Sequence, residues 1–224
     1  TAGIVWHERQ QALQLAETTA ARRAHRLAQD LAQSLTLARR AIEQIEAIRA
    51  QDPDRKPVPP EAVRQQQALL SALHLPLQLR EIEPQTSVAG VAPHWQAGLP
   101  ERDVTAAVLP LIWSEPGAPG AGPRTFRADL SLDALQKRLE QDRAPPGGGA
   151  TLFRLDPDGQ VTVLARAPFA QREQGLRIGG SLAQTLATGE RGAFSSPGVI
   201  DGIARRAAYQ RLPFPADTLV IAYG

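Results

Sequence analysis

Cysteine and methionine are both absent from the 224 residues of this chain. The lack of cysteine excludes disulfide bonds, thiolate metal sites and cysteine nucleophiles, and it is compatible with an oxidising compartment. A chain that begins at Thr1 and has no methionine also lacks a start residue of its own. We therefore expect the sequence to be a piece of a longer protein.

Long apolar runs and a strong charge imbalance are absent as well. No stretch approaches the roughly 18 to 20 consecutive apolar residues that cross a bilayer, and no signal peptide opens the chain. The 25 basic and 23 acidic residues leave a formal net charge of +2 and are spread along the sequence, which argues against a nucleic-acid partner. Because 42% of the residues are hydrophobic, the chain can still build a core, and we expect a soluble, folded fragment.

The motifs that begin to suggest catalysis or metal binding are all incomplete. His7 and Glu8 start like a zinc-protease helix, but position 11 is Gln, so the second histidine ligand is missing. The glycines at 147–149 lack the Lys and Ser/Thr of a phosphate-binding loop and follow no predicted strand. We predict a chain that is not an enzyme and that holds no metal or cofactor.

One long helix is predicted from Glu8 to about Ala50, a segment without Gly or Pro that is dominated by good helix formers. An apolar seam with spacings of three and four residues runs along this helix. It is formed by Leu27, Leu31, Leu35, Ala38, Ile42 and Ile45. This spacing is typical of a coiled coil, so the seam predicts a homodimer through the helix. The alternative is that the seam packs on its own domain. Both can hold for one helix if part of it packs on the domain and another part forms the dimer.

After a proline-rich loop, the pattern changes from helical to extended and back. A second helix is predicted from Glu61 to just before Pro76, and a third, capped by Ser131, from Leu132 to Gln141. The expected strands of this part are 77–83, 88–91, 104–113 and 125–130. A run of Pro and Gly at 144–149 marks a boundary, so we predict a helix and linker at 1–60, one subdomain at 61–146 and another at 147–224.

The last subdomain has the element order β-β-α-β-β-β. Strands are expected at 150–155, 160–167, 192–195, 203–211 and 218–223, with a helix at 181–187. The turn Asp156, Pro157, Asp158, Gly159 joins the first two strands as a hairpin. We predict an α+β fold, with a long N-terminal helix followed by PAS-like antiparallel sheets.

Three sequence motifs resemble those of double-Cache sensors, the PDC class of extracytoplasmic domains. Residues 148–168 resemble the run G-G-x-x-x-L-x-R-x-D-G-x-x-L-A-R-x-P of the membrane-proximal halves of that family. Residues 201–212 resemble its hairpin D-G-x-x-R-x-x-A-Y-R-x-L, and residues 126–135 are similar to its strand-to-helix link between the two halves. The resemblance implies a double-Cache arrangement with a reduced distal half.

Membership of that class implies a periplasmic part of an inner-membrane protein, held by transmembrane helices on either side of this fragment. Such domains sense ligands and feed a histidine kinase, a diguanylate cyclase or a chemotaxis-type output. The resemblance therefore predicts a ligand-sensing input domain. The alternative is a ligand-free dimerisation or protein-interaction module, which the low aromatic content of 4% and the apolar seam favour.

Candidate ligand residues come from the same resemblance. In double-Cache domains that bind amino acids, an Arg ahead of a strand binds the carboxylate and an Asp ending a later strand binds the ammonium, which implies these roles for Arg102 and Asp129. Trp95 and Trp113 can supply the aromatic lining. In the alternative interpretation, Arg102 pairs with a neighbouring carboxylate, Asp129 caps the following helix and both tryptophans belong to the core.

Two further candidates lie in the second motif. Asp201 and Tyr209 belong to the C-terminal hairpin and are predicted to face a ligand in the membrane-proximal half. The alternative is that Asp201 shapes its turn and that Tyr209 packs in the core. A small molecule, either an amino acid or another carboxylate, is the predicted ligand.

Overall fold

The computed structural model divides the chain into two compact units. The residues it describes are 2–50, 61, 64–68, 77–82, 94–97, 101–102, 107–115, 124–141, 148–168, 173–196, 198, 200, 202–212 and 218–224. The six-stranded unit contains Thr1–Asp30, Gln136–Leu212 and Asp217–Gly224, and the five-stranded unit contains Leu31–Leu135 and Pro213–Ala216. The N-terminal helix therefore contributes residues to both units.

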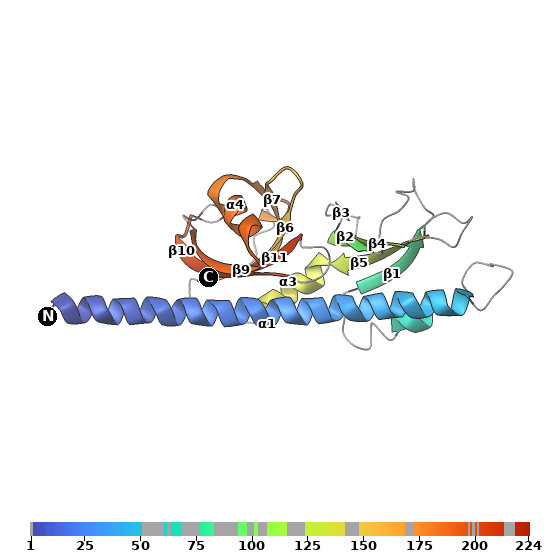
Figure 1. Ribbon diagram of the computed structural model, residues 1–224, viewed down its shortest axis with the longest axis horizontal. Coiled ribbons are helices and arrows are strands. Elements are labelled where there is room, and N and C mark those ends of the chain that lie inside the picture. The colour runs from blue at the N-terminus through green and yellow to red at the C-terminus, as the bar shows by residue number, and fades with distance from the viewer. Residues whose placement is uncertain are drawn as a thin grey trace. The chain divides into compact units, whose positions relative to one another are not determined.

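The first element is the predicted long helix, α1, which runs unbroken from Ala2 to Ala50 (Figure 1). Its 49 residues correspond to about 74 Å at the usual rise per residue. Leu27, Leu31 and Leu35 of the apolar seam are buried within this single chain, which is the intramolecular packing considered as one alternative. A dimer would have to use other side chains along this part of the helix.

The five-stranded unit contains one antiparallel sheet. Its strands are β1 (Leu77–Ile82), β2 (His94–Ala97), β3 (Glu101–Arg102), β4 (Ala107–Glu115) and β5 (Arg124–Ser131). They pair in the order β1-β5-β4-β2, with β3 also on β4. Helix α3 (Leu132–Gln141) follows β5 directly, and the hydroxyl of Ser131 accepts a hydrogen bond from the Ala134 amide at 3.2 Å, as expected of its cap.

The six-stranded unit has the strand order of a PAS domain. Its elements are β6 (Ala150–Leu155), β7 (Val161–Ala167), β8 (Arg177–Ile178), α4 (Gly180–Thr188), β9 (Arg191–Ser196), β10 (Arg205–Arg211) and β11 (Leu219–Tyr223). They pair in the order β8-β7-β6-β11-β10-β9, all antiparallel (Figure 1). The hairpin turn closes with a hydrogen bond from the Gly159 amide to the Asp156 carbonyl at 3.0 Å. Gly159 has a φ of 77°, a conformation that favours glycine.

The core of this unit lies between the sheet and α4. It consists of Phe153, Val161, Val163, Ile178, Leu182, Ala183, Leu186, Tyr209, Val220 and Ala222. Because successive residues of a strand point to opposite sides, these residues define one face of the sheet, which we call the inner face. Arg211 holds the end of α4 there, since its Nη2 donates to the carbonyls of Leu186 at 3.0 Å and Ala187 at 2.7 Å.

The opposite, outer face of the same sheet packs on the first part of α1. The buried apolar residues that the described part of the helix supplies within this unit are Ala20, Ala24, Leu27 and Ala28. Three polar pairs join the helix to the outer face, namely Arg23 with the Tyr223 hydroxyl, Glu17 with Arg206 at 3.4 Å, and His25 with Gln210 at 3.4 Å. Along β10 and β11, every second side chain therefore faces α1, and the side chains between them face the core.

Some predicted elements lie outside the described residues. The strand expected at 88–91 and most of the helix expected between Glu61 and Pro76 belong to this group, although Glu61 and 64–68 are helical. Three short strands, β2, β3 and β8, were not predicted. They have two to four residues each, which is too short for an alternating pattern to be recognised in the sequence.

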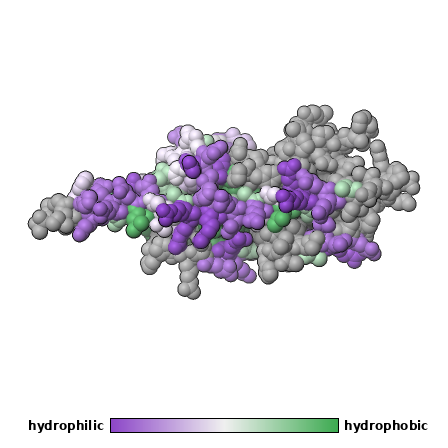
Figure 2. All heavy atoms as spheres, turned by 60° about the horizontal axis from the view of Figure 1, so that its bottom comes forward, coloured by the Kyte–Doolittle hydropathy of each residue, from purple (hydrophilic) through white to green (hydrophobic). Residues whose placement is uncertain are grey.

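Hydrophilic side chains predominate on the face of α1 that Figure 2 turns forward, with small separate apolar patches. Among the helices that the structure describes, none combines the length and the apolar character that a membrane span requires.

Candidate functional site

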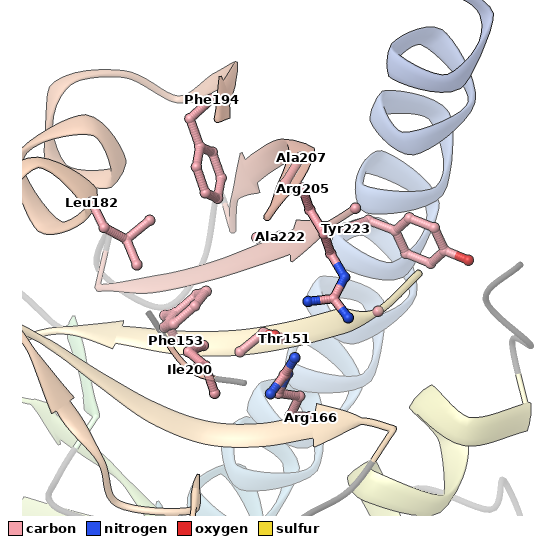
Figure 3. A pocket seen from close by; sticks show the side chains of 12 residues that line it. Thr151, Phe153, Arg166, Leu182, Phe194, Ile200, Arg205, Ala207, Ala222 and Tyr223 are labelled. Atoms are coloured by element: carbon pink, nitrogen blue, oxygen red, sulfur yellow. The ribbon is translucent and has the colours of Figure 1, made fainter. Parts of the chain in front are cut away.

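A small cavity lies on the inner face of the six-stranded sheet (Figure 3). It is lined by Gly149, Thr151, Phe153, Arg166, Leu182, Phe194, Ile200, Arg205, Ala207, Ala222, Tyr223 and Gly224. These residues come from β6, β7, β9, β10, β11 and α4 and from the segments that flank them. The same face carries the hydrophobic core, so the cavity continues the core toward one end of the sheet.

The cavity has one cationic end. Arg166 and Arg205 point toward the same part of it, with Thr151 beside them (Figure 3). Thr151 pairs in register with Arg166 of β7 on one side and with Ala222 of β11 on the other, so all three lie on the inner face. Arg205 reaches that face from β10, two residues before Ala207.

A β-bulge is what brings Arg166 to the inner face. The pairing of β6 with β7 shifts between Leu152 and Phe153, where the partner changes from Ala165 to Val163. Strict alternation from Val163 would assign Ala165, and not Arg166, to the core side. The extra residue in β7 reverses this assignment.

The two arginines have defined contacts inside the protein. Arg166 is buried, and its Nη1 donates to Glu173 Oε2 at 2.7 Å, while its backbone amide donates to the Gln136 side chain at 2.8 Å. Arg205 is half-buried, and its Nη1 donates to the Ile203 carbonyl at 3.2 Å. Both guanidinium groups are thus held in place at the cavity without depending on a ligand.

The other end of the cavity is apolar, formed by Phe153, Leu182, Phe194 and Ile200. The volume is about 50 Å³. Ligand pockets for drug-sized molecules have roughly 300 to 1,000 Å³, so this cavity suits only a very small guest.

A second, larger hollow lies on the outer face, between α1 and the strands β9 and β10. It measures about 1050 Å³. The residues lining it are Gln10, Gln14, Glu17, Thr18, Ala21, Arg22, His25, Arg191, Gly192, Ala193, Arg206, Ala208, Tyr209 and Gln210. Most of these side chains are polar and exposed, so the hollow is an open polar groove beside the helix and lacks the apolar enclosure of a typical ligand pocket.

The predicted ligand residues of the five-stranded unit do not all share one face of its sheet. Trp95 pairs in register with Trp113, and Arg102 pairs with Ala107, an even number of residues from Trp113 along β4. These three positions therefore belong to one face. Asp129 pairs with Pro110, an odd number of residues from Trp113, so it belongs to the opposite face. The register does not bring Arg102 and Asp129 together as a clamp.

Asp129 itself is buried, with 2% of its surface exposed, and it accepts a hydrogen bond from Arg127 Nε. Arg127 lies two residues earlier on the same face of β5, so the ion pair is local to the strand. The cap that the structure shows for the helix that follows is Ser131, as described above.

In the six-stranded unit, Tyr209 lies in the core cluster, where its ring is 6.2 Å from that of Phe194. Asp201 lies outside the described residues. Sequence analysis missed Arg166 and Arg205 as candidate site residues. A signal was available in the sequence. Arg166 occupies the arginine position of L-A-R-x-P in the first motif, and Arg205 occupies that of D-G-x-x-R in the second.

Among the side chains that the structure describes, no three His, Asp or Glu residues gather as a metal site.

The fold is that of Cache-type sensor domains of histidine kinases and chemoreceptors. The extracellular domain of rpHK1S-Z16, described as a histidine kinase, matches with a TM-score of 0.69 at 18% identity over 95% of each chain. The periplasmic sensory domain of the Campylobacter jejuni chemoreceptor Tlp1 matches with a TM-score of 0.66 at 8% identity over 94% of each chain. The ligand-binding domain of the Pseudomonas fluorescens chemoreceptor CtaA, in complex with L-isoleucine, gives 0.59 at 14% identity over 96% of this chain and 94% of that one.

Neither a protein-family model nor a curated protein sequence matches the chain. The structural neighbours confirm the predicted α+β fold and the predicted likeness to this class of domain. They are sensor and ligand-binding domains and not catalytic ones.

Proposed function

We propose that this chain is the extracytoplasmic, ligand-sensing input domain of a bacterial membrane receptor. It is periplasmic, is held at the membrane by flanking helices, and passes ligand binding to a cytoplasmic output such as a histidine kinase or a diguanylate cyclase. It performs no catalysis itself. The support is the fold together with the way in which one strand connects the cavity to the long helix.

That strand is β11, which carries the proposal. Ala222 and Gly224 line the cavity on the inner face, while Tyr223 between them reaches Arg23 of α1 on the outer face. In Figure 3 the Tyr223 side chain points away from the cavity toward the helix. Because neighbouring residues of a strand move together, a displacement of β11 at the cavity also acts on α1. Helix α1 belongs to both units, so it can carry a signal from either of them.

The proposed ligand is a small molecule, either an amino acid or another carboxylate. The CtaA domain named above was solved with L-isoleucine, which makes amino acids the first compounds to test. In the five-stranded unit, Arg102, Trp95 and Trp113 remain the proposed ligand residues on one face of the sheet, and Asp129 remains a candidate on the other.

A thermal-shift screen of the whole chain against amino acids and small carboxylates tests ligand binding. A true ligand should stabilise the fold progressively, by about 2.7 kcal/mol at a concentration 100-fold above Kd. A Trp6→Phe variant leaves only Trp95 and Trp113 of the three tryptophans. The change in its tryptophan fluorescence should then saturate as the ligand concentration rises, and the Kd fitted to that change should equal the Kd obtained from thermal shift. If no compound gives a saturable change in either measurement, the ligand-free alternative is preferred.

Hydrogen exchange tests the transmission step. With a ligand found in the screen, amide exchange should slow in β11 and in the part of α1 around Arg23. An Arg23→Ala variant should bind the ligand but lose the slowing in α1, while Arg9→Ala, which removes an exposed arginine from the same helix, should keep it. Loss of the effect in both variants, or in neither, would contradict a signal carried through Arg23.

The alternative, a ligand-free assembly module, is favoured by one observation. Trp6 and Leu15 of α1 are 64% and 70% exposed, so each is an apolar side chain that a second copy can contact. A two-fold homodimer through one face of the N-terminal helix would cover Leu15. The proposed sensor can form the same dimer, so only the ligand screen separates the two functions.

A further inference from the structure

We infer that the cavity of the six-stranded unit is a binding site for a short-chain monocarboxylate with two or three carbon atoms. This inference rests on the proposed function and deepens it, because it names the chemical class of ligand for the cavity that β11 links to α1. The site is separate from the residues predicted in the five-stranded unit. The assignment rests on the composition of the two ends of the cavity and on its size.

The cationic end is suited to a carboxylate. A guanidinium has five N–H donors and can hold several acceptors at once, so Arg166 can keep Glu173 and still reach into the cavity. Arg205 supplies a second guanidinium, and the Thr151 hydroxyl can donate to the same anion. Among the described residues that line the cavity, none is acidic, so an anion meets no like charge in that lining.

The apolar end and the volume limit the rest of the ligand. One enclosed water needs roughly 10 to 15 Å³, so a cavity of about 50 Å³ has room for about four water-sized groups. Acetate has four non-hydrogen atoms and propionate has five. With the carboxylate at Arg166 and Arg205, their methyl or ethyl groups would lie toward Phe153, Leu182 and Phe194.

Such a ligand would also contact the strand that links the cavity to α1. Ala222 and Gly224 form part of the cavity wall, and Gly224 pairs with Gly149 through two backbone hydrogen bonds of 2.5 and 2.9 Å. An added Cβ at Gly224 would come within 2.8 Å of the Ala207 Cβ, so the wall is closely packed at this point. A ligand in the cavity would therefore contact the last strand, β11, and could displace it.

Isothermal titration of the whole chain with a homologous series tests the inference. Acetate and propionate should bind with 1:1 stoichiometry, whereas butyrate and benzoate should bind at least tenfold more weakly because the cavity is too short for them. Acetamide has the shape of acetate without its charge and should not bind. Chloride and inorganic phosphate distinguish recognition of a carboxylate from attraction of any anion, and equal binding of phosphate would overturn the inference.

Two substitutions on one strand provide the matched comparison. Arg205→Gln removes the inner-face guanidinium and should raise the Kd for acetate at least tenfold, while Arg205→Lys should retain part of the affinity. Arg206→Gln removes the same charge from the outer face, where Arg206 pairs with Glu17, and should leave the Kd within about twofold. Circular dichroism of each variant establishes that it is folded before its Kd is compared.

The outcomes separate this site from the proposed sensor function. If an amino acid from the screen binds but acetate and propionate do not, the second site is wrong and the sensor proposal stands. If acetate binds equally well to wild type, Arg205→Gln and Arg206→Gln, the anion binds elsewhere and the assignment of this cavity is wrong. If only short carboxylates bind, and only with Arg205 intact, the cavity is a ligand site of the chain.

Discussion

Arg23 of α1 lies over the ring of Tyr223 in β11, with its Cζ 5.2 Å from the ring centroid, and it also donates a hydrogen bond to the tyrosine hydroxyl. The two residues are 200 positions apart in the sequence. Tyr223 is buried and Arg23 is half-buried, so the contact is shielded from solvent on the strand side. It joins the end of the last strand to the N-terminal half of the helix.

Removing this contact should loosen the helix from the sheet. Arg23→Ala loses both the cation–π contact and the hydrogen bond, and we expect it to lower the free energy of unfolding by about 1 to 2 kcal/mol. Tyr223→Phe keeps the ring and should cost less. In urea unfolding, the double variant should lose less than the sum of the two single variants, because both remove the same hydrogen bond. Strict additivity would mean that the two side chains act independently.

A buried ion pair in the hairpin should be far more sensitive. Arg154 donates to Asp156 from Nε at 2.8 Å and from Nη2, and the Thr162 hydroxyl donates to the other carboxylate oxygen at 2.6 Å. Asp156→Ala leaves the buried Arg154 without this carboxylate, so we expect a loss of about 3 kcal/mol or more in the free energy of unfolding. Asp158→Asn, in the exposed part of the same turn, should lower it much less, because solvent screens an exposed pair. Similar losses from both variants would contradict the role of burial.

The exposed carboxylate of that turn has an altered acidity. A hydrogen bond from Arg177 to the Asp158 side chain lowers the pKa of Asp158 below its ordinary value of 3.8. Because the folded pKa is the lower one, the stability that this pair contributes is present above about pH 4 and is lost as the pH falls through the folded value. A carboxyl-carbon NMR titration should show the low pKa in wild type and a return toward 3.8 in Arg177→Gln. An unchanged titration in that variant would mean that Arg177 is not the cause.

Much of the fold could be predicted because its signals are local. The helix from 8 to 50 follows from composition, the cap of α3 from Ser131, and the hairpin from the turn at 156–159. The short strands β2, β3 and β8 could not be predicted in the same way, because two to four residues have no readable period and are fixed by their partners in the sheet.

The cavity depends on long-range order that no local pattern contains. Strands β6 and β11 separate the strands of Arg166 and Arg205 in the sheet, and the two side chains reach the same part of the cavity across them (Figure 3). The bulge at Leu164 then places Arg166 on the inner face, against the alternation that the sequence suggests. The apolar seam of α1 was ambiguous for a related reason. Spacing shows that a face is apolar, but it does not tell whether the same chain or a second copy covers it.

The contact between β9 and β10 allows no side chain at position 192. An added Cβ there would lie 2.8 Å from Cε1 of Tyr209, a buried core residue with little room to move. Gly192→Ala should therefore lower the free energy of unfolding by about 1 to 3 kcal/mol. Gly179→Ala is the control, since the nearest atom to its Cβ would be Gln160 Cγ at 3.9 Å. Thermal unfolding of the two variants tests this prediction, because Gly192→Ala should melt at the lower temperature. Equal melting temperatures would show that the Tyr209 side chain can move aside.

The homodimer through α1 is best tested at Leu15, because the predicted seam is buried where the structure describes its side chains. Leu15 and Trp6 are nine residues apart, which places them about 180° apart around the helix. Trp6 continues a line of every seventh residue that is buried from Ala20 onward, whereas Leu15 lies on the solvent side.

A two-fold interface on the solvent side of α1 would bury Leu15 of both copies, which contributes about 3 kcal/mol or more. In sedimentation equilibrium we expect Leu15→Gln to raise the dimer Kd at least tenfold, and Trp6→Gln, the control on the opposite side of the helix, to change it less than threefold. A strong effect of Trp6→Gln alone would move the interface to the opposite face, and a wild-type chain that stays monomeric at about 100 µM would exclude a stable dimer of this chain.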